Sequence, residues 1–184
     1  NPVERTRLPK IHSTTCCMPN AWRFFAQLPE YVLSVRNDGV CVNLYTDATA
    51  RYALPGGNAI RLDMQTRYPH EGQVRLKITP DKPARLAVYL RIPSWCETAT
   101  VKVGGEPVAL AKPGTYHRIE RQWLPGDEIN LDLRMKPAVV LSPPEVAANR
   151  GQLALRRGPL IYCLEKQDAA GLDLEIVSLV LDST

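Results

Sequence analysis

Two adjacent cysteines, Cys16 and Cys17, carry the clearest potential for chemistry in this sequence. They lie in segment 14–20, Thr-Thr-Cys-Cys-Met-Pro-Asn, directly before a stretch with helical spacing of apolar residues. A thiolate near a helix N-terminus is stabilised by the helix dipole and by free backbone N–H groups, which favours the nucleophilic form. Two thiolates also supply half of a tetrahedral zinc site. The pair is therefore a candidate nucleophile or a candidate metal-binding pair.

The remaining cysteines and histidines do not complete such a site in the sequence. There is no Cys-x-x-Cys motif and no histidine pair at ligand spacing. Cys41, Cys96 and Cys163 each lie within or beside an alternating apolar pattern, so we expect them in the core. The same interpretation, small buried residues where the chain enters the fold, is locally favoured for Cys16 and Cys17. A strained vicinal disulfide between those two is a third alternative.

Aromatic side chains raise the alternative of a sugar-binding surface. His70 lies in a loop between two expected strands, Tyr-Pro-His-Glu-Gly at 68–72, where exposed side chains can meet a ligand. Aromatic residues in strands more often pack in the core or across strands than stack on sugars, and a polar turn is the simpler interpretation of the loop. The aromatic candidates are Tyr45, Tyr68, Tyr89, Trp95, Tyr116 and Trp123.

One helix and a series of strands must position these residues. Ala21, Phe24, Phe25 and Leu28 have helical spacing, which predicts a helix over 20–28 with Asn20 as its N-cap and Pro29 near its end. Trp22, Phe24 and Phe25 of so short a helix need a partner surface, which either the sandwich or an upstream helical domain would supply.

After residue 40 the pattern changes to alternation with period two, which predicts half-buried strands. Gly-Gly or Pro-Gly pairs at 104–105, 113–114 and 125–126 fall at hairpin spacing. Strands repeated without intervening helices predict a mainly β fold, an antiparallel β-sandwich preceded by a short helical segment. The expected strands lie around 40–46, 60–64, 74–78, 86–92, 101–103, 129–133, 153–155 and 160–164.

Composition excludes several classes of protein. The 184 residues are 45% hydrophobic and 23% charged, typical of a folded domain and untypical of disordered, collagen-like or coiled-coil chains. The 23 basic and 19 acidic residues are interspersed, with a net charge of +4, and Arg156-Arg157 is the only adjacent basic pair. We therefore expect no nucleic-acid partner. No apolar run approaches the roughly 20 residues of a membrane span, so we expect no membrane partner.

The ends and the cysteines bear on the cellular setting. The chain begins Asn-Pro-Val without methionine, so we expect a piece of a longer protein. An odd number of cysteines in a chain that needs no disulfides favours a reducing compartment, and we expect a cytoplasmic location.

Several motifs, in order, resemble the C-terminal part of bacterial β-L-arabinofuranosidases of glycoside hydrolase family 127. The resemblance covers most of the chain. A Cys-Cys-Pro-Pro-Asn-type motif opens a helix in that family, and Met18 stands here where proline is more frequent. The matching segments are CCMPN at 16–20 followed by Arg23, DGVCVNLY at 38–45, TRYP at 66–69, LRIPSWC at 90–96, WLPGD at 123–127 and RGPLIYCLE at 157–165.

The resemblance implies an (α/α)₆-barrel catalytic module followed by β-sandwich modules. Residues 1–35 would be the tail of the barrel, 36–170 a β-sandwich domain, and 171–184 the start of a following segment or a terminal strand. It further implies that Cys16 is a nucleophile forming a thioglycosyl intermediate, and that Cys16 and Cys17 both bind Zn²⁺. The other zinc ligands and the general acid/base would lie upstream of Asn1.

Two functions are consistent with these observations. The first is a fragment of a retaining glycoside hydrolase for β-L-arabinofuranosides, with a zinc-bound cysteine nucleophile and no activity by itself. The second is a non-catalytic β-sandwich that packs on the barrel or binds carbohydrate. The expected partners are the upstream barrel module and an oligosaccharide or plant-derived glycan, and a homodimer is left open. The two functions differ on whether Cys16 is required.

Overall fold

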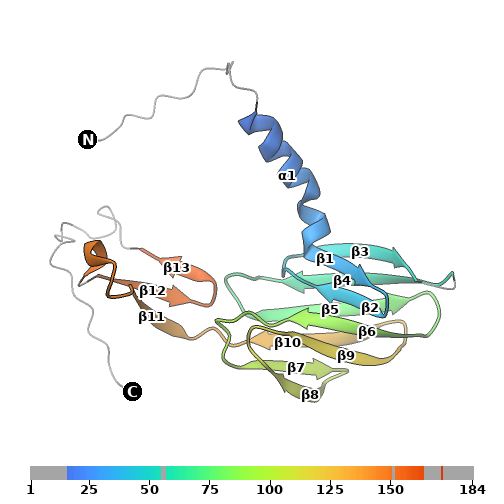
Figure 1. The fold of residues 1–184 in the computed structure, drawn as a ribbon. Helices are drawn as coiled ribbons and strands as arrows, with labels where there is room; N and C mark the ends of the chain where they lie inside the picture. Colours follow the sequence, from blue (N-terminus) through green and yellow to red (C-terminus); the bar gives the residue numbers. More distant parts are fainter. Residues whose placement is uncertain (1–15, 55–56, 151, 164–170, 172–184) are drawn as a thin grey trace.

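Two β-sheets packed face to face form the centre of the computed structural model, which describes residues 16–54, 57–150, 152–163 and 171 (Figure 1). A third, smaller sheet follows them. The fold is mainly β with one helix near the start of the described chain, as the sequence predicts. The four-stranded sheet has the order β1 (Leu33–Arg36), β2 (Gly39–Val42), β6 (Ala84–Arg91) and β9 (Tyr116–Trp123).

The second sheet has six strands, and every pairing in it is antiparallel. Its order follows hairpin connections except where β10 inserts between β5 and β7. The strands, in spatial order, are β3 (Ala48–Ala53), β4 (Ala59–Thr66), β5 (Gln73–Pro80), β10 (Asp127–Leu133), β7 (Ala99–Val103) and β8 (Glu106–Ala111).

The third sheet lies beyond the end of β10 and is antiparallel: β11 (Pro137–Leu141), β12 (Leu153–Arg157) and β13 (Leu160–Tyr162), with a short 3₁₀ helix at Ala147–Asn149. The expected strand 160–164 ends at Tyr162. Cys163 follows it and is exposed, so the prediction that Cys163 lies in the core is wrong. The alternating sequence pattern extends beyond Tyr162, the last residue of β13. A thiol is buried only where its strand is paired and another layer of the protein covers it.

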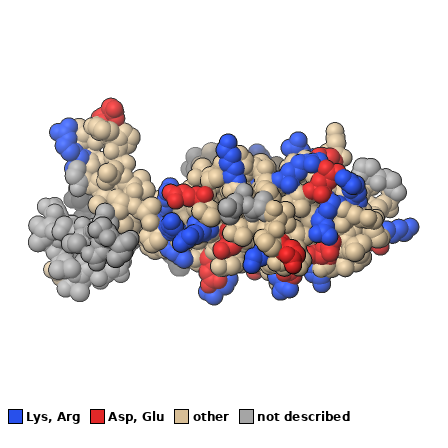
Figure 2. Space-filling view, turned by 90° about the horizontal axis from the view of Figure 1, so that it is seen from below, with Lys and Arg blue, Asp and Glu red and all other residues tan. Residues whose placement is uncertain are grey.

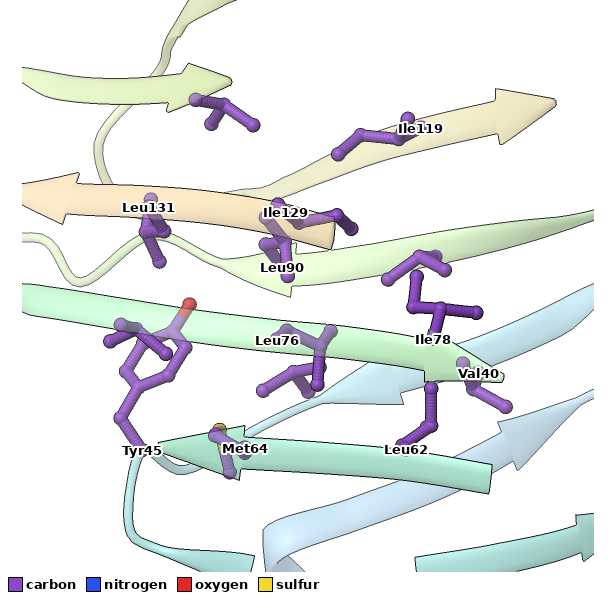
Figure 3. Close-up of a cluster of buried hydrophobic side chains, with 14 of the residues drawn as sticks. Val40, Tyr45, Leu62, Met64, Leu76, Ile78, Leu90, Ile119, Ile129 and Leu131 are labelled. Carbon is purple, nitrogen blue, oxygen red and sulfur yellow. The ribbon is translucent and has the colours of Figure 1, made fainter. Parts of the chain in front are cut away.

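The core lies between the two larger sheets (Figure 3). Alternation decides which side chains enter it: Ile60, Leu62 and Met64 of β4 are buried, whereas Arg61 between them is exposed. Each such aliphatic side chain contributes about 1.5–3 kcal/mol when fully removed from water. Cys41 and Cys96 are buried as expected, and the expected strand 40–46 ends at Val42.

One pairing breaks the antiparallel rule. Strand β2 runs parallel to β6, with Gly39 opposite Ala87 and Val42 opposite Leu90. The two strands approach so closely that a Cβ built on Gly39 would lie 1.8 Å from the carbonyl oxygen of Ala87. Glycine is therefore required at the start of β2.

The helix α1 (Cys17–Val32) is longer than predicted at both ends. It begins at Cys17, with Cys16 in the N-cap position, so Asn20 is not the N-cap. The Asn20 N–H instead donates to the Cys16 carbonyl within the first turn (3.3 Å). Pro29 lies inside the helix, which continues to Val32 because Val32 and Leu33 are buried in the sandwich core. No helix in the described ranges has the length and apolar character of a membrane span.

Substitution of Gly39 tests the close approach of β2 and β6. We expect Gly39→Ala to lower the free energy of unfolding by about 3 kcal/mol or more, because the added methyl group overlaps a backbone oxygen that cannot move alone. Gly57→Ala is the control: Gly57 has φ +83° with open space around it, so only about 1–2 kcal/mol of backbone strain is expected. Urea unfolding of both variants measures the difference, and equal losses would contradict the steric explanation.

His117 on β9 makes stability depend on pH. Its Nε2 is buried without a hydrogen-bond partner among the described residues, and burial lowers its pKa below the usual 6.5. At pH 7.5 and above the imidazole is almost entirely neutral in both the folded and the unfolded state, so it takes nothing from the free energy of unfolding. As pH falls through 6.5, the unfolded chain binds the proton more readily, so the free energy of unfolding decreases until the lowered folded-state pKa is passed.

We therefore expect the urea midpoint to fall between pH 7.5 and 5.5, and to fall less in His117→Gln. Asp38, Asp63, Glu120 and Glu128 have lowered pKa values and titrate below this window. The same pH dependence in wild type and variant would assign the effect to another group.

Candidate functional site

The cysteine pair lies at the free end of α1. Cys16 and Cys17 are both exposed, so the interpretation of these two as buried small residues is wrong for the described chain. Their Sγ atoms are 3.8 Å apart and both thiols are free. A disulfide requires about 2.05 Å, which excludes the vicinal disulfide in this structure.

The spacing of the two sulfurs fits a shared metal ion. A tetrahedral zinc ion with Zn–S bonds of about 2.3 Å separates two thiolate ligands by about 3.8 Å. The 3.8 Å between the Sγ atoms of Cys16 and Cys17 is compatible with this value, and it is also the distance of an ordinary thiol–thiol hydrogen bond. Among the described residues no group of three His, Cys, Asp or Glu side chains could hold a metal ion. The pair can thus supply two zinc ligands, and the other two must come from elsewhere.

The sandwich cannot provide these ligands, because α1 holds the pair away from it (Figure 1). The helix is attached at its other end, where the Asn43 and Leu44 N–H groups donate to the Val32 carbonyl (2.9 and 3.3 Å). From Cys17 to Val32 the helix rises about 22 Å, at about 1.5 Å per residue. Any partner of the thiols must therefore approach from outside the described sandwich.

The helix presents an apolar surface along this length. Every residue of α1 except Val32 is exposed. An amphipathic helix of this kind is normally stabilised by packing against other elements. The prediction that the helix needs a partner surface is supported by its large exposed side chains, which are Met18, Trp22, Phe24, Phe25, Leu28 and Tyr31.

Asn20 and Arg23 lie on the same side of the helix as Cys16, four and seven residues along. The Arg23 Nη1 donates to the Asn20 Oδ1 (3.1 Å), which directs the guanidinium back towards the start of the helix. This pair brings a cation to the side of α1 that carries the thiol. Asn20 and Arg23 both belong to the segment, CCMPN at 16–20 followed by Arg23, that resembles the family motif.

A second polar cluster, which the sequence does not reveal, lies on the outer face of the four-stranded sheet. The Tyr89 hydroxyl donates to the Asp38 Oδ2 (2.6 Å), and the Arg118 Nε donates to the Tyr89 hydroxyl oxygen (3.0 Å). The Tyr89 bond is the main cause of the lowered pKa of Asp38. The three residues join the β1–β2 turn to β6 and β9, so their role is to fix the sheet.

The aromatic candidates divide by burial. Tyr45, Tyr89 and Trp123 are buried, so packing rather than sugar stacking accounts for them, as expected. Tyr116 is exposed and its hydroxyl donates to the Asn43 Oδ1 (2.7 Å). His70 is exposed, and its backbone carbonyl accepts a hydrogen bond from Arg157 (2.8 Å). Tyr68 and Trp95 are half-buried at one end of the sandwich.

Comparison with known families matches most of the chain after β1, whereas α1 and the cysteine pair lie before the matched residues. The model of the "Beta-L-arabinofuranosidase, GH127 middle domain" matches residues 39–135. The model of the "Glycoside hydrolase family 127 C-terminal domain" matches residues 137–184. The chain belongs to glycoside hydrolase family 127. The resemblance seen in the sequence is thereby confirmed.

Relatives support this membership. A non-reducing end beta-L-arabinofuranosidase of Bifidobacterium longum is 29% identical over 167 residues, which are 85% of this chain and 24% of that protein. The crystal structure of a GH127 beta-L-arabinofuranosidase from Geobacillus stearothermophilus T6 is 37% identical with a TM-score of 0.76, covering 86% of this chain and 25% of that one. A structure described as a glycoside hydrolase is 34% identical with a TM-score of 0.78, covering 89% and 28%.

The chain therefore spans about a quarter of the length of these relatives. The division between the two family domains coincides with a structural boundary: β10 ends at Leu133 and β11 begins at Pro137. The sandwich domain predicted over 36–170 thus extends across both family domains, which meet at residue 136.

The exposure of the thiols predicts which of them react. We expect iodoacetamide to modify Cys16, Cys17 and Cys163 in the native chain, because all three are exposed. Cys41 and Cys96 should react only after unfolding, because they are buried and burial raises the pKa of Cys96. Peptide mass spectrometry of native and urea-unfolded samples makes the comparison. Rapid native labelling of Cys96, or a mass deficit of two daltons before reduction, would contradict this structure.

Proposed function

We propose that this chain is the C-terminal part of a retaining glycoside hydrolase acting on β-L-arabinofuranosides, with Cys16 as nucleophile and Zn²⁺ as cofactor. The observation that carries the proposal is the exposed pair Cys16 and Cys17 with sulfurs at zinc-ligand spacing. The relatives named as β-L-arabinofuranosidases support the substrate class. The whole protein would then be the enzyme.

The chemistry assigned to Cys16 is a double displacement. The Cys16 thiolate attacks the anomeric carbon, the bond from that carbon to the leaving oxygen breaks, and a proton donor of another module protonates that oxygen. Water then attacks the same carbon, gives its proton to the same group, and releases the thiolate. Zn²⁺ bound by Cys16 and Cys17 would keep the thiol deprotonated. The second displacement restores the starting configuration.

Among the described residues, the parts that this reaction needs beside the thiols are missing. The described residues bring no carboxylate and no third metal ligand to the thiols, since α1 carries them about 22 Å from its attached end. The exposed apolar side chains of α1 fit the interior of a helical barrel, which we propose as the upstream partner. Residues 1–35 would belong to that barrel.

A second candidate function, a non-catalytic sandwich that packs on the barrel or binds carbohydrate, is favoured by a specific observation. Most of the described chain is sandwich, and it is joined to α1 by buried contacts at Val32 and Leu33 rather than through the thiols. Under this alternative Cys16 is dispensable. The two functions therefore predict different effects of a single substitution, Cys16→Ser, on the activity of the whole protein.

We expect Cys16→Ser in the whole protein to lower the hydrolysis of an aryl β-L-arabinofuranoside by about a thousandfold or more, because the thiolate is replaced by a far weaker nucleophile. Metal analysis should find about one zinc per wild-type chain and less in Cys17→Ser. Cys163→Ser is the matched control, an exposed thiol outside the pair, and should retain full activity.

Unchanged activity in Cys16→Ser would exclude the nucleophile and leave the accessory function. The 184-residue chain alone serves as a further control and is expected to hydrolyse nothing. Hydrolysis by this chain that depends on Cys16 would show that no upstream module is needed.

A further inference from the structure

A small cavity lies where the sandwich meets the third sheet. Its volume is about 100 Å³, and its walls include Trp95 from the loop after β6 and Arg156 from β12. Water occupies about 30 Å³ per molecule in the liquid, so the space holds about three waters. A carboxylate-sized group fits this volume, and a whole sugar ring does not.

Cationic side chains dominate the wall of this cavity. Arg134, Lys136 and Arg156 line it together with one carboxylate, Glu97, which leaves a net charge of +2. Among the described residues none of the three cations takes part in an ion pair, although most charged neighbours on the sandwich do. An anion that enters the cavity can therefore form charge-assisted hydrogen bonds with cations that have no carboxylate partner among the described residues.

Trp95 is held rigidly at this cavity. Its indole stacks on the Tyr68 ring, with centroids 6.5 Å apart and planes at 20°. Tyr68 in turn meets Tyr45 edge to face at 5.7 Å. Tyr45 is buried and its hydroxyl donates to the Arg91 carbonyl (2.5 Å). Trp95 is thus an aromatic wall that needs no rearrangement on binding.

The opposite wall is fixed by contacts between the third sheet and the sandwich. Next to Arg156, the Arg157 side chain donates to the His70 carbonyl (2.8 Å). At Gly158 an added Cβ would lie 2.9 Å from the Met135 side chain, so the turn after β12 is closely packed there. These two contacts hold the end of β12, next to Arg156, against the His70 loop and Met135.

We infer that this cavity binds the carboxylate of a sugar acid, as found in a glycan that carries uronic acid residues. The carboxylate would pair with the guanidinium and ammonium groups, which bind oxyanions strongly, and the sugar ring would lie at the mouth beside Trp95. The aromatic wall favours a saccharide over a bare oxyanion or an acidic peptide. This site is separate from the thiols, and its binding needs no hydrolysis.

The test is binding of methyl glucuronoside to the 184-residue chain by isothermal titration calorimetry, beside the neutral methyl glucoside. We expect the acidic sugar to bind about tenfold more tightly or better, since the carboxylate would add charge-assisted hydrogen bonds that the neutral sugar cannot form. The double variant Lys136→Gln/Arg156→Gln should lose about tenfold in affinity. Lys112→Gln, an exposed lysine outside the cavity wall, is the charge-matched control and should bind within about twofold of wild type.

Circular dichroism and the urea midpoint check that each variant is folded. Trp95→Leu is a second variant, which leaves the charges in place and tests the aromatic wall alone. Equal affinity for acidic and neutral sugars, or unchanged affinity in the double variant, would overturn the inference. Sulfate, phosphate or a glutamate-rich peptide binding as tightly as the glucuronoside would also overturn it, because the sugar would then contribute nothing. Loss of arabinofuranosidase activity in Cys16→Ser has no bearing on this measurement.

Discussion

The burial of two apolar sheet faces against each other is the constraint on which the rest of the chain depends. Val32 and Leu33, where α1 passes into β1, are part of the same buried core as Ile78 and Ile129 of the opposite sheet. The helix is therefore anchored at its last residue and free along the rest. On the face of the molecule seen in Figure 2, acidic and basic side chains lie side by side over the sandwich, and the apolar surface of α1 differs from it in suiting contact with another module.

The sequence predicts those parts of the fold that depend on local period. Alternation in β4 and β5 identifies Ile60, Leu62 and Leu76 as core residues, and the structure buries all three. Strand β2 follows a different rule, because all four of its residues are buried, and it pairs in parallel with β6, more than forty residues away. A local pattern contains no information about strand direction or about a neighbour so distant. The close approach of Gly39 to the Ala87 carbonyl is therefore not predictable from the sequence.

The candidate site shows the same division. The cysteine pair is apparent from residue type and spacing, but its exposure is not, because cysteine is usually buried in complete folds. Cys16, Cys17 and Cys163 are exposed where the described chain offers no covering layer. The predicted helix start is wrong because Asn20 is a good N-cap by residue type, whereas in the structure its side-chain oxygen accepts a hydrogen bond from Arg23. The bond between Tyr89 and Asp38 depends on pairing register and has no sequence signal.

The anchored end of α1 and the wall of the cationic cavity share one short segment. Leu44 donates its N–H to the Val32 carbonyl, and the next residue, Tyr45, supports Tyr68 and through it Trp95. The Arg91 carbonyl accepts from Tyr45, while the Arg91 side chain donates to the Asn43 carbonyl. Displacement of segment 43–45 would thus disturb both the attachment of α1 at Val32 and the position of Trp95. A module packed on α1, as proposed, would consequently be oriented relative to the cavity by these buried contacts and hydrogen bonds, and a glycan bound at Trp95 would be oriented with it.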